Sequence, residues 1–162
     1  NPLFFAGTSS LAYEIAKTPG IPDKVFVPVG NGTMLLGLYI AFKEISEMPQ
    51  LIAVQSENCS PVYNHCYNKN NKCLKTAAEG IAVASPPRMQ EIIKAIKDSN
   101  GDIIRVSESS IKKTVNEIHK MGIYIETTSA VAVAGLKKYN DSNKISDNEK
   151  IVIPLTGSGL KK

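Results

Sequence analysis

Residues 24–42 read KVFVPVGNGTMLLGLYIAF, and this stretch decides the fold. Residues 24–29 are apolar at nearly every position, as expected of a strand covered on both faces of a sheet. Residues 33–47 predict a helix that is apolar through Phe42 and charged at its far end. Pro28 and the glycines argue against a membrane span, because they would leave backbone groups unpaired in lipid. The stretch therefore predicts a buried strand, a glycine turn and a buried helix.

The same alternation of strands and helices continues along the chain. Helical spacing is clearest in residues 89–96, where four apolar side chains fall on one face, and Ser107 is a plausible N-cap for a later helix. Further predicted strands are Leu51–Gln55, Ile103–Val106, Ile123–Ile125 and Ile151–Leu155; further predicted helices are Glu108–Met121 and Thr127–Lys138. The polar segments 68–72 and 140–148 predict loops. This order predicts one α/β domain over residues 1–162, with a largely parallel sheet between helical layers.

Composition limits the classes of function. The net charge of +4 rests almost wholly on lysine, without the arginine-rich stripe that nucleic-acid binding favours, so no nucleic-acid partner is expected. Cys59, Cys66 and Cys73 are odd in number, and their spacing fits no common zinc pattern even beside His65. We therefore expect free thiols, no metal, no membrane partner and a cytoplasmic location, since no signal peptide opens the chain.

The most informative segment is the loop Gly30-Asn31-Gly32-Thr33, between the first strand and its helix. Glycines let backbone N–H groups turn towards one point, where the helix dipole adds positive potential. Thr33 can cap the helix or donate its hydroxyl to an anion. A phosphate monoester fits such a loop without any arginine or lysine.

Other interpretations of this glycine loop remain open. A P-loop is excluded because no Gly-Lys-Ser/Thr follows. A dinucleotide fingerprint needs a glycine where Leu35 stands, although Glu57 resembles the acid that binds ribose in that motif. A plain strand-to-helix turn with no ligand is the third possibility.

Two further loops lie where an α/β sheet binds ligands, beyond the carboxyl ends of strands. Thr156 follows the last predicted strand and precedes two glycines; it either donates a hydrogen bond to a flat ring or caps the strand end. The segment 126–129 (ETTS) also joins a predicted strand to a helix. Capping of that helix by Thr127 or Thr128 is the simpler interpretation.

Together these pieces resemble the large domain of threonine synthases and related fold-type II pyridoxal-phosphate enzymes. The resemblance follows the family's order and spacing over nearly the whole chain. The matching stretches are NPLFFAGTSSLAYEIA, VFVPVGNGTMLLGLYIAFKEI, LIAVQSENCSPV, YIETTSAVAVAGL and IVIPLTGSGLKK. The resemblance implies an incomplete fold like that of the tryptophan synthase β-subunit.

The resemblance also implies roles for particular residues. The loop residues Gly30, Asn31, Gly32 and Thr33 match the segment that holds the cofactor phosphate. Thr156 matches the residue that hydrogen-bonds the pyridine nitrogen, and a neutral hydroxyl there leaves that nitrogen largely unprotonated. Glu126 and Ser129 match a stretch near the ring. The sequence departs from some family members at Thr33, Met34 and Ser158, where a glycine, an asparagine and a histidine stand instead.

The family's Schiff-base lysine lies in a Ser-x-Lys context upstream of Asn1, and no lysine of the chain has that context. We therefore expect a fragment, itself inactive, of an enzyme that converts O-phosphohomoserine to L-threonine by γ-elimination and β-addition of water. The expected partner is an amino-acid phosphate substrate, and the family suggests a homodimer. The alternatives are a cysteate synthase, an enzyme like threonine dehydratase, and a stand-alone phosphate- or nucleotide-binding domain.

Overall fold

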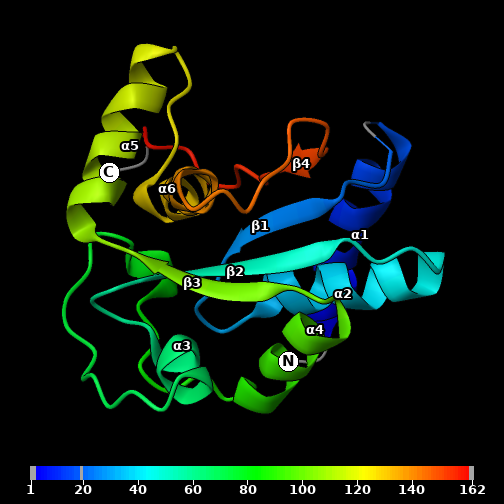
Figure 1. Cartoon of the computed structure of the whole chain (residues 1–162), viewed down its shortest axis with the longest axis horizontal. Helices are drawn as coiled ribbons and strands as arrows, with labels where there is room; N and C mark the ends of the chain where they lie inside the picture. The colour runs from blue at the N-terminus through cyan, green and yellow to red at the C-terminus, as the bar shows by residue number, and fades with distance from the viewer. Residues whose placement is uncertain (1–2, 19, 161–162) are drawn as a thin grey trace.

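The computed structural model describes residues 3–18 and 20–160, so Asn1, Pro2, Lys161 and Lys162 of the quoted motifs lie outside the described residues. Its strands form a four-stranded parallel sheet in the order β3-β2-β1-β4 (Figure 1). The strands are β1 (Lys24–Pro28), β2 (Gln50–Ser56), β3 (Asp102–Val106) and β4 (Ile151–Val152). The helices are α1 (Leu3–Lys17), α2 (Thr33–Ile45), α3 (Pro61–Cys66), α4 (Met89–Asp98), α5 (Glu108–Lys120) and α6 (Thr127–Asp141), with a 3₁₀ helix η1 (Glu79–Ile81).

Helices cover both faces of the sheet. The helices α1, α2 and α4 share one core with alternate residues of β1, such as Val25 and Val27. On the opposite face, Phe26 packs with α6, where the Tyr139 ring meets it edge-on at 5.5 Å between centroids. Alternate side chains of a strand point to opposite faces, so both must be apolar when both faces are covered. The three-layer α/β fold with a parallel sheet is confirmed.

Helix α1 was not predicted, and it packs closely on α2 through small residues. A Cβ added at Gly37 would lie 2.1 Å from Thr8 Oγ1. Thr8 Oγ1 donates to the carbonyl of Thr33 at 3.3 Å, and Ser9 Oγ donates to that of Gly37 at 3.4 Å. Helix α1 therefore packs against and hydrogen-bonds to the start of α2, where the glycine loop ends.

One predicted strand is absent, and several predicted boundaries are wrong, including that of the helix 33–47, which ends at residue 45. Residues 123–125 form no strand: the chain turns at Gly122, with φ at 84°, and Ile125 makes only an isolated bridge to Ser158. The last strand ends at Val152 rather than Leu155, in keeping with Pro154, which has no N–H for a sheet hydrogen bond. The predicted loop 140–148 begins late, because α6 continues through Asp141.

Candidate functional site

The glycine loop follows the carboxyl end of β1. A buried glutamine on β2 forms a hydrogen bond with the residue that precedes this loop. Gln55 is fully buried; its Nε2 donates to the carbonyl of Val29 at 3.0 Å. Its Oε1 accepts from the backbone N–H groups of Val62 and Tyr63, both at 3.1 Å. Gln55 was missed as a site residue, because it ends the predicted strand and its hydrogen-bond partners cannot be identified from the sequence.

The two glycines of the loop are required by close packing. A Cβ at Gly30 would lie 2.8 Å from Ile81 Cα, and a Cβ at Gly32 would lie 2.4 Å from Ile92 Cγ1. Gly32 also has a φ of 77°, in the left-handed region that favours glycine. Buried Gly30 and Gly32 therefore alternate with exposed Asn31 and half-buried Thr33.

Helix α2 begins directly at this loop, and no side chain caps it. Gly32 is the N-cap, and it has no side chain with which to accept a bond from the first turn. The thirteen-residue helix directs its first N–H groups and the positive end of its dipole to the loop. Amides without a side-chain cap next to glycines suit an anion such as a phosphate monoester.

The second loop is held in place by Ser129 at the start of α6. Ser129 is fully buried, and its Oγ accepts from the backbone N–H of Thr156 at 3.2 Å and of Gly157 at 3.3 Å. Thr156 itself is exposed. Its loop follows β4, which pairs in parallel with β1, so the two loops leave the same edge of the sheet.

Glu126 also contacts the second loop. Its backbone N–H donates to the carbonyl of Gly157 at 3.0 Å. A Cβ at Gly157 would lie 1.9 Å from Glu126 Cδ, so the carboxylate side chain occupies the space beside this glycine. The segment 126–129 and the loop 156–157 are therefore brought together as one unit.

The predicted capping of α6 by Thr127 or Thr128 is wrong. Glu126 is the N-cap residue, and no side chain caps the helix. Thr127 Oγ1 instead donates to the carbonyl of Ala77 at 2.6 Å, and Thr128 Oγ1 would lie 2.7 Å from a Cβ at Gly80. Because Ile81 contacts Gly30, the 3₁₀ helix η1 lies between the glycine loop and the start of α6.

A pocket of about 340 Å³ lies beside η1 and the second loop. Its polar lining includes Glu79, His119, Glu126 and Ser158. His119 is half-buried, and its Nε2 lies 3.0 Å from the carbonyl oxygen of Ile125.

Glu108 ties together the segments around η1, and it too was missed. Its carboxylate accepts from Ser56 Oγ at 2.5 Å, from Thr76 Oγ1 at 2.6 Å and from the N–H of Ala77 at 2.9 Å. Burial favours a higher pKa for Glu108, but these hydrogen bonds and the charge of Lys112 outweigh burial and lower the pKa. Glu108 is therefore held as a carboxylate that joins β2, the segment before η1 and α5.

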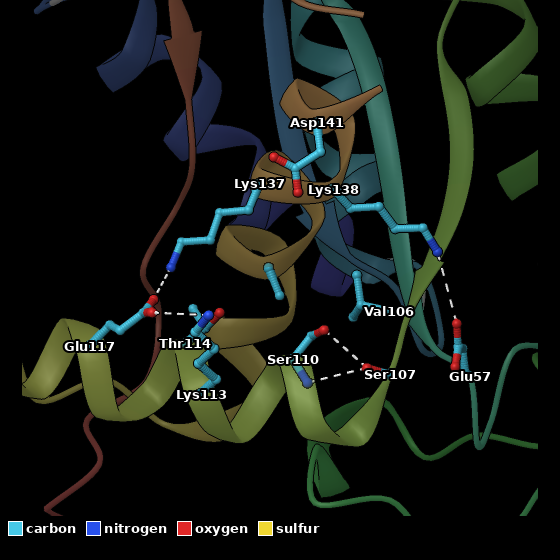
Figure 2. Close-up of a pocket in the computed structure, with 11 residues that line it drawn as sticks. Glu57, Val106, Ser107, Ser110, Lys113, Thr114, Glu117, Lys137, Lys138 and Asp141 are labelled. Atoms are coloured by element: carbon cyan, nitrogen blue, oxygen red, sulfur yellow. Dashed lines mark hydrogen bonds and ion pairs between the residues drawn. The ribbon is translucent and has the colours of Figure 1, made fainter. Parts of the chain in front are cut away.

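A second pocket, of about 310 Å³, lies between α5 and α6 (Figure 2). Its basic groups are paired: Lys113 and Lys137 with Glu117, and Lys138 with Glu57 at 3.8 Å. Glu57 lines this pocket on the α6 side of the sheet, whereas the helix that follows the glycine loop lies on the other side. A ribose-binding role for Glu57 beside the glycine loop is therefore not supported.

The described residues hold no group of three His, Cys, Asp or Glu side chains that would bind a metal ion. Within residues 3–18 and 20–160, no helix combines the length and the apolar character needed to span a bilayer.

Residues 1–157 match the family model described as pyridoxal-phosphate dependent enzyme. The chain is 31% identical to threonine synthase from Methanocaldococcus jannaschii, over 99% of this chain and 43% of that protein. It is 28% identical to chloroplastic threonine synthase 2 from Arabidopsis thaliana, over 99% of this chain and 34% of that protein.

Solved structures share the fold. Threonine deaminase isoform 2 from Solanum lycopersicum superposes with a TM-score of 0.80 at 25% identity, over 97% of this chain and 46% of that chain. Cysteine synthase from Entamoeba histolytica gives a TM-score of 0.78 at 25% identity, over 98% and 44%. The chain thus spans less than half the length of these relatives.

Proposed function

Since this chain belongs to the family of pyridoxal-phosphate dependent enzymes, we propose that it is the cofactor-holding part of a lyase of the threonine synthase type. The proposed reaction converts O-phosphohomoserine to L-threonine by γ-elimination followed by addition of water at the β carbon. The catalytic lysine and the substrate-binding domain are proposed to lie outside residues 1–162. By itself, the 162-residue chain is expected to be inactive.

One observation carries the proposal: an uncapped helix start and an exposed threonine follow neighbouring parallel strands, β1 and β4. The resident residues fit pyridoxal phosphate. The glycine loop offers backbone N–H groups to a phosphate, and Thr156 offers a hydroxyl to a ring nitrogen. No basic side chain is needed for the phosphate, since the amides and the helix dipole supply the positive potential.

When bound, pyridoxal phosphate supplies an electron sink for charge that develops on the substrate. In the proposed site, the amides of residues 30–33 bind the phosphate and fix the position of the ring. The Thr156 hydroxyl donates to the ring nitrogen, or accepts from it when that nitrogen is protonated. Ser129 holds the Thr156 backbone, and Glu126 packs against the adjacent Gly157.

The test uses the full-length parent protein, assayed for phosphate release from O-phosphohomoserine. Release from O-phosphoserine in place of O-phosphohomoserine would overturn the proposed substrate. The variant Thr156→Val should keep the cofactor absorbance and lose turnover by about 10-fold or more, because the ring loses its hydrogen-bond partner. Unchanged turnover would remove Thr156 from the site.

A second candidate is ammonia release from threonine. It is favoured by the superposition on tomato threonine deaminase over 97% of this chain. Ammonia release without phosphate release from the respective substrates would select it, and sulfite-dependent replacement of O-phosphoserine would select a cysteate synthase.

A stand-alone binding domain is the alternative without chemistry. Titrating the 162-residue chain with pyridoxal phosphate or NAD, and following the amides of residues 30–33 by NMR, separates it from our proposal. A response to NAD alone would favour a nucleotide-binding module.

We further propose a cytoplasmic homodimer that acts on an amino-acid phosphate and binds neither nucleic acid nor membrane.

A further inference from the structure

Two of the three cysteines face each other across a loop beside the candidate site. Cys59 Sγ and Cys73 Sγ lie 2.6 Å apart, although both belong to the free thiols of the chain. The surrounding backbone fixes this approach: the N–H of Leu74 donates to the carbonyl of Asn58 at 2.6 Å, and Asn58 Nδ2 donates to the carbonyl of Lys75 at 2.7 Å. The two sulfurs are therefore juxtaposed by hydrogen bonds on the neighbouring residues.

We propose that Cys59 and Cys73 form a reversible intramolecular disulfide, while Cys66 stays a free thiol. A disulfide bond requires the two sulfurs at about 2.05 Å, so only a small movement separates the dithiol from the bonded pair. Cys66 ends α3 and is exposed, whereas Cys59 is 2% exposed and Cys73 is half-buried.

The oxidant is a small-molecule disulfide such as oxidised glutathione. The Cys73 thiolate attacks one of its sulfurs, forms a mixed disulfide and releases one small thiolate. Cys59 then gives its proton to solvent and attacks the Cys73 sulfur, releasing the second thiolate. Two protein thiols are oxidised and one external disulfide is reduced to two thiols. Cys73 begins the exchange because it is half-buried, whereas Cys59 is 2% exposed. Burial, followed by the hydrogen bond and the charge of Cys73, also raises the pKa of Cys59 to about 12.

The bond would close residues 59–73 into a loop and fasten its two ends. One end adjoins Ser56 and the other adjoins Thr76, and both of these hydroxyls donate to Glu108. The segment after Thr76 leads into η1, which contacts Gly30. Oxidation would therefore restrain the segment that leads into η1, and through η1 it would restrain the packing against Gly30. Disulfides in a reducing compartment are usually redox-responsive pairs of this kind.

The experiment uses the 162-residue chain. The chain is incubated with oxidised or reduced glutathione, and its free thiols are then alkylated with iodoacetamide. Its intact mass is measured by mass spectrometry, and the chain is digested with trypsin under non-reducing conditions. Trypsin releases Cys73 in the peptide 73–75 and Cys59 together with Cys66 in the peptide 44–69. The variant Cys66→Ser is the matched control, since it removes the one cysteine that the proposal leaves free.

We expect one alkylated thiol per oxidised chain instead of three, a loss of two hydrogen atoms, and a 44–69/73–75 cross-link that dithiothreitol reverses. The cross-link should persist in Cys66→Ser and vanish in Cys73→Ser, and oxidation should raise the Tm by roughly 5–10 °C. Three alkylated thiols, a stable glutathione adduct at Cys73, or a cross-link lost in Cys66→Ser would each overturn the proposal. The test needs no cofactor or substrate, so its outcome is independent of the proposed function.

Discussion

Replacing Gly32 by alanine tests how tightly the glycine loop is built. Gly32 has a φ of 77°, and a left-handed conformation costs a residue with a Cβ roughly 1–2 kcal/mol. Reduced entropy of the unfolded chain offsets about 0.4–1 kcal/mol of this. The new Cβ would also lie 2.4 Å from Ile92 Cγ1 and 2.5 Å from Cδ1. Ile92 is fully buried and cannot turn into solvent, so overpacking adds about 1–3 kcal/mol.

The expected loss is therefore about 2–4 kcal/mol in the free energy of unfolding, measured by urea denaturation of the chain. Gly122→Ala is the matched control, because Gly122 has a φ of 84° and nothing within 4 Å of the added Cβ. It should lose only the conformational part, about 1 kcal/mol. Gly7 lies within α1, and a Cβ added there also has nothing within 4 Å. In Gly7→Ala the free energy of unfolding should therefore rise by about 0.5–1 kcal/mol.

The contact with Ile92 is tested by a double-mutant cycle. If that contact carries the extra cost, combining Gly32→Ala with Ile92→Ala should recover about 1–3 kcal/mol relative to the sum of the single changes. The reasoning is refuted if Gly32→Ala costs no more than Gly122→Ala, or if the two changes simply add. Either result would mean that the loop can accommodate a Cβ at residue 32, contrary to the close contact with Ile92.

Three further predictions concern the contacts around the candidate site and α6. In Ser129→Ala, which removes the acceptor shared by two backbone amides, the chain should lose about 1–3 kcal/mol in urea denaturation, and those amides should exchange faster with deuterium. The pKa of Glu108 is lowered in the folded chain, so its carboxylate stabilises the fold above its unfolded pKa, about 4.3. This stabilisation is lost as the pH falls through the folded pKa. In Glu108→Gln the free energy of unfolding should therefore fall less steeply between about pH 5 and 3 than in the unaltered chain. Gly135→Ala should cost about 1–3 kcal/mol because its Cβ would lie 2.7 Å from Val54 Cγ2, and Val54→Ala should relieve that cost in a double-mutant cycle.

The apolar pattern predicts the sheet because it records burial directly. In β1 every residue is buried, so neither face needs polar positions and the run is unmistakable. The same logic fails for residues 123–125, where apolar Ile123 and Tyr124 are exposed and no strand among the described residues pairs with them. It also fails for α1, whose contact with α2 depends on Gly37 and Thr8, small residues that leave little trace in a hydrophobic period.

The candidate site is predictable where it depends on local order along the chain. A glycine loop between a strand and a helix is legible in the sequence, as is a threonine after the last strand. Gln55 and Glu108 were missed because their roles consist of bonds to atoms distant in sequence, such as the carbonyl of Val29. A polar side chain reveals such a role only once its partners are known.

Thr156 shows why the two kinds of information are needed together. The sequence left open whether Thr156 donates to a ring or caps the strand end. Its backbone is already fixed by the buried Ser129 Oγ, and β4 ends at Val152, well before Thr156. The exposed Thr156 side chain is therefore not required to end the strand, and its hydroxyl can meet a ligand without first breaking a hydrogen bond to any of the described residues. A site in which one residue places the backbone and another contacts the ligand keeps the contacting group preorganised, so binding costs less conformational entropy.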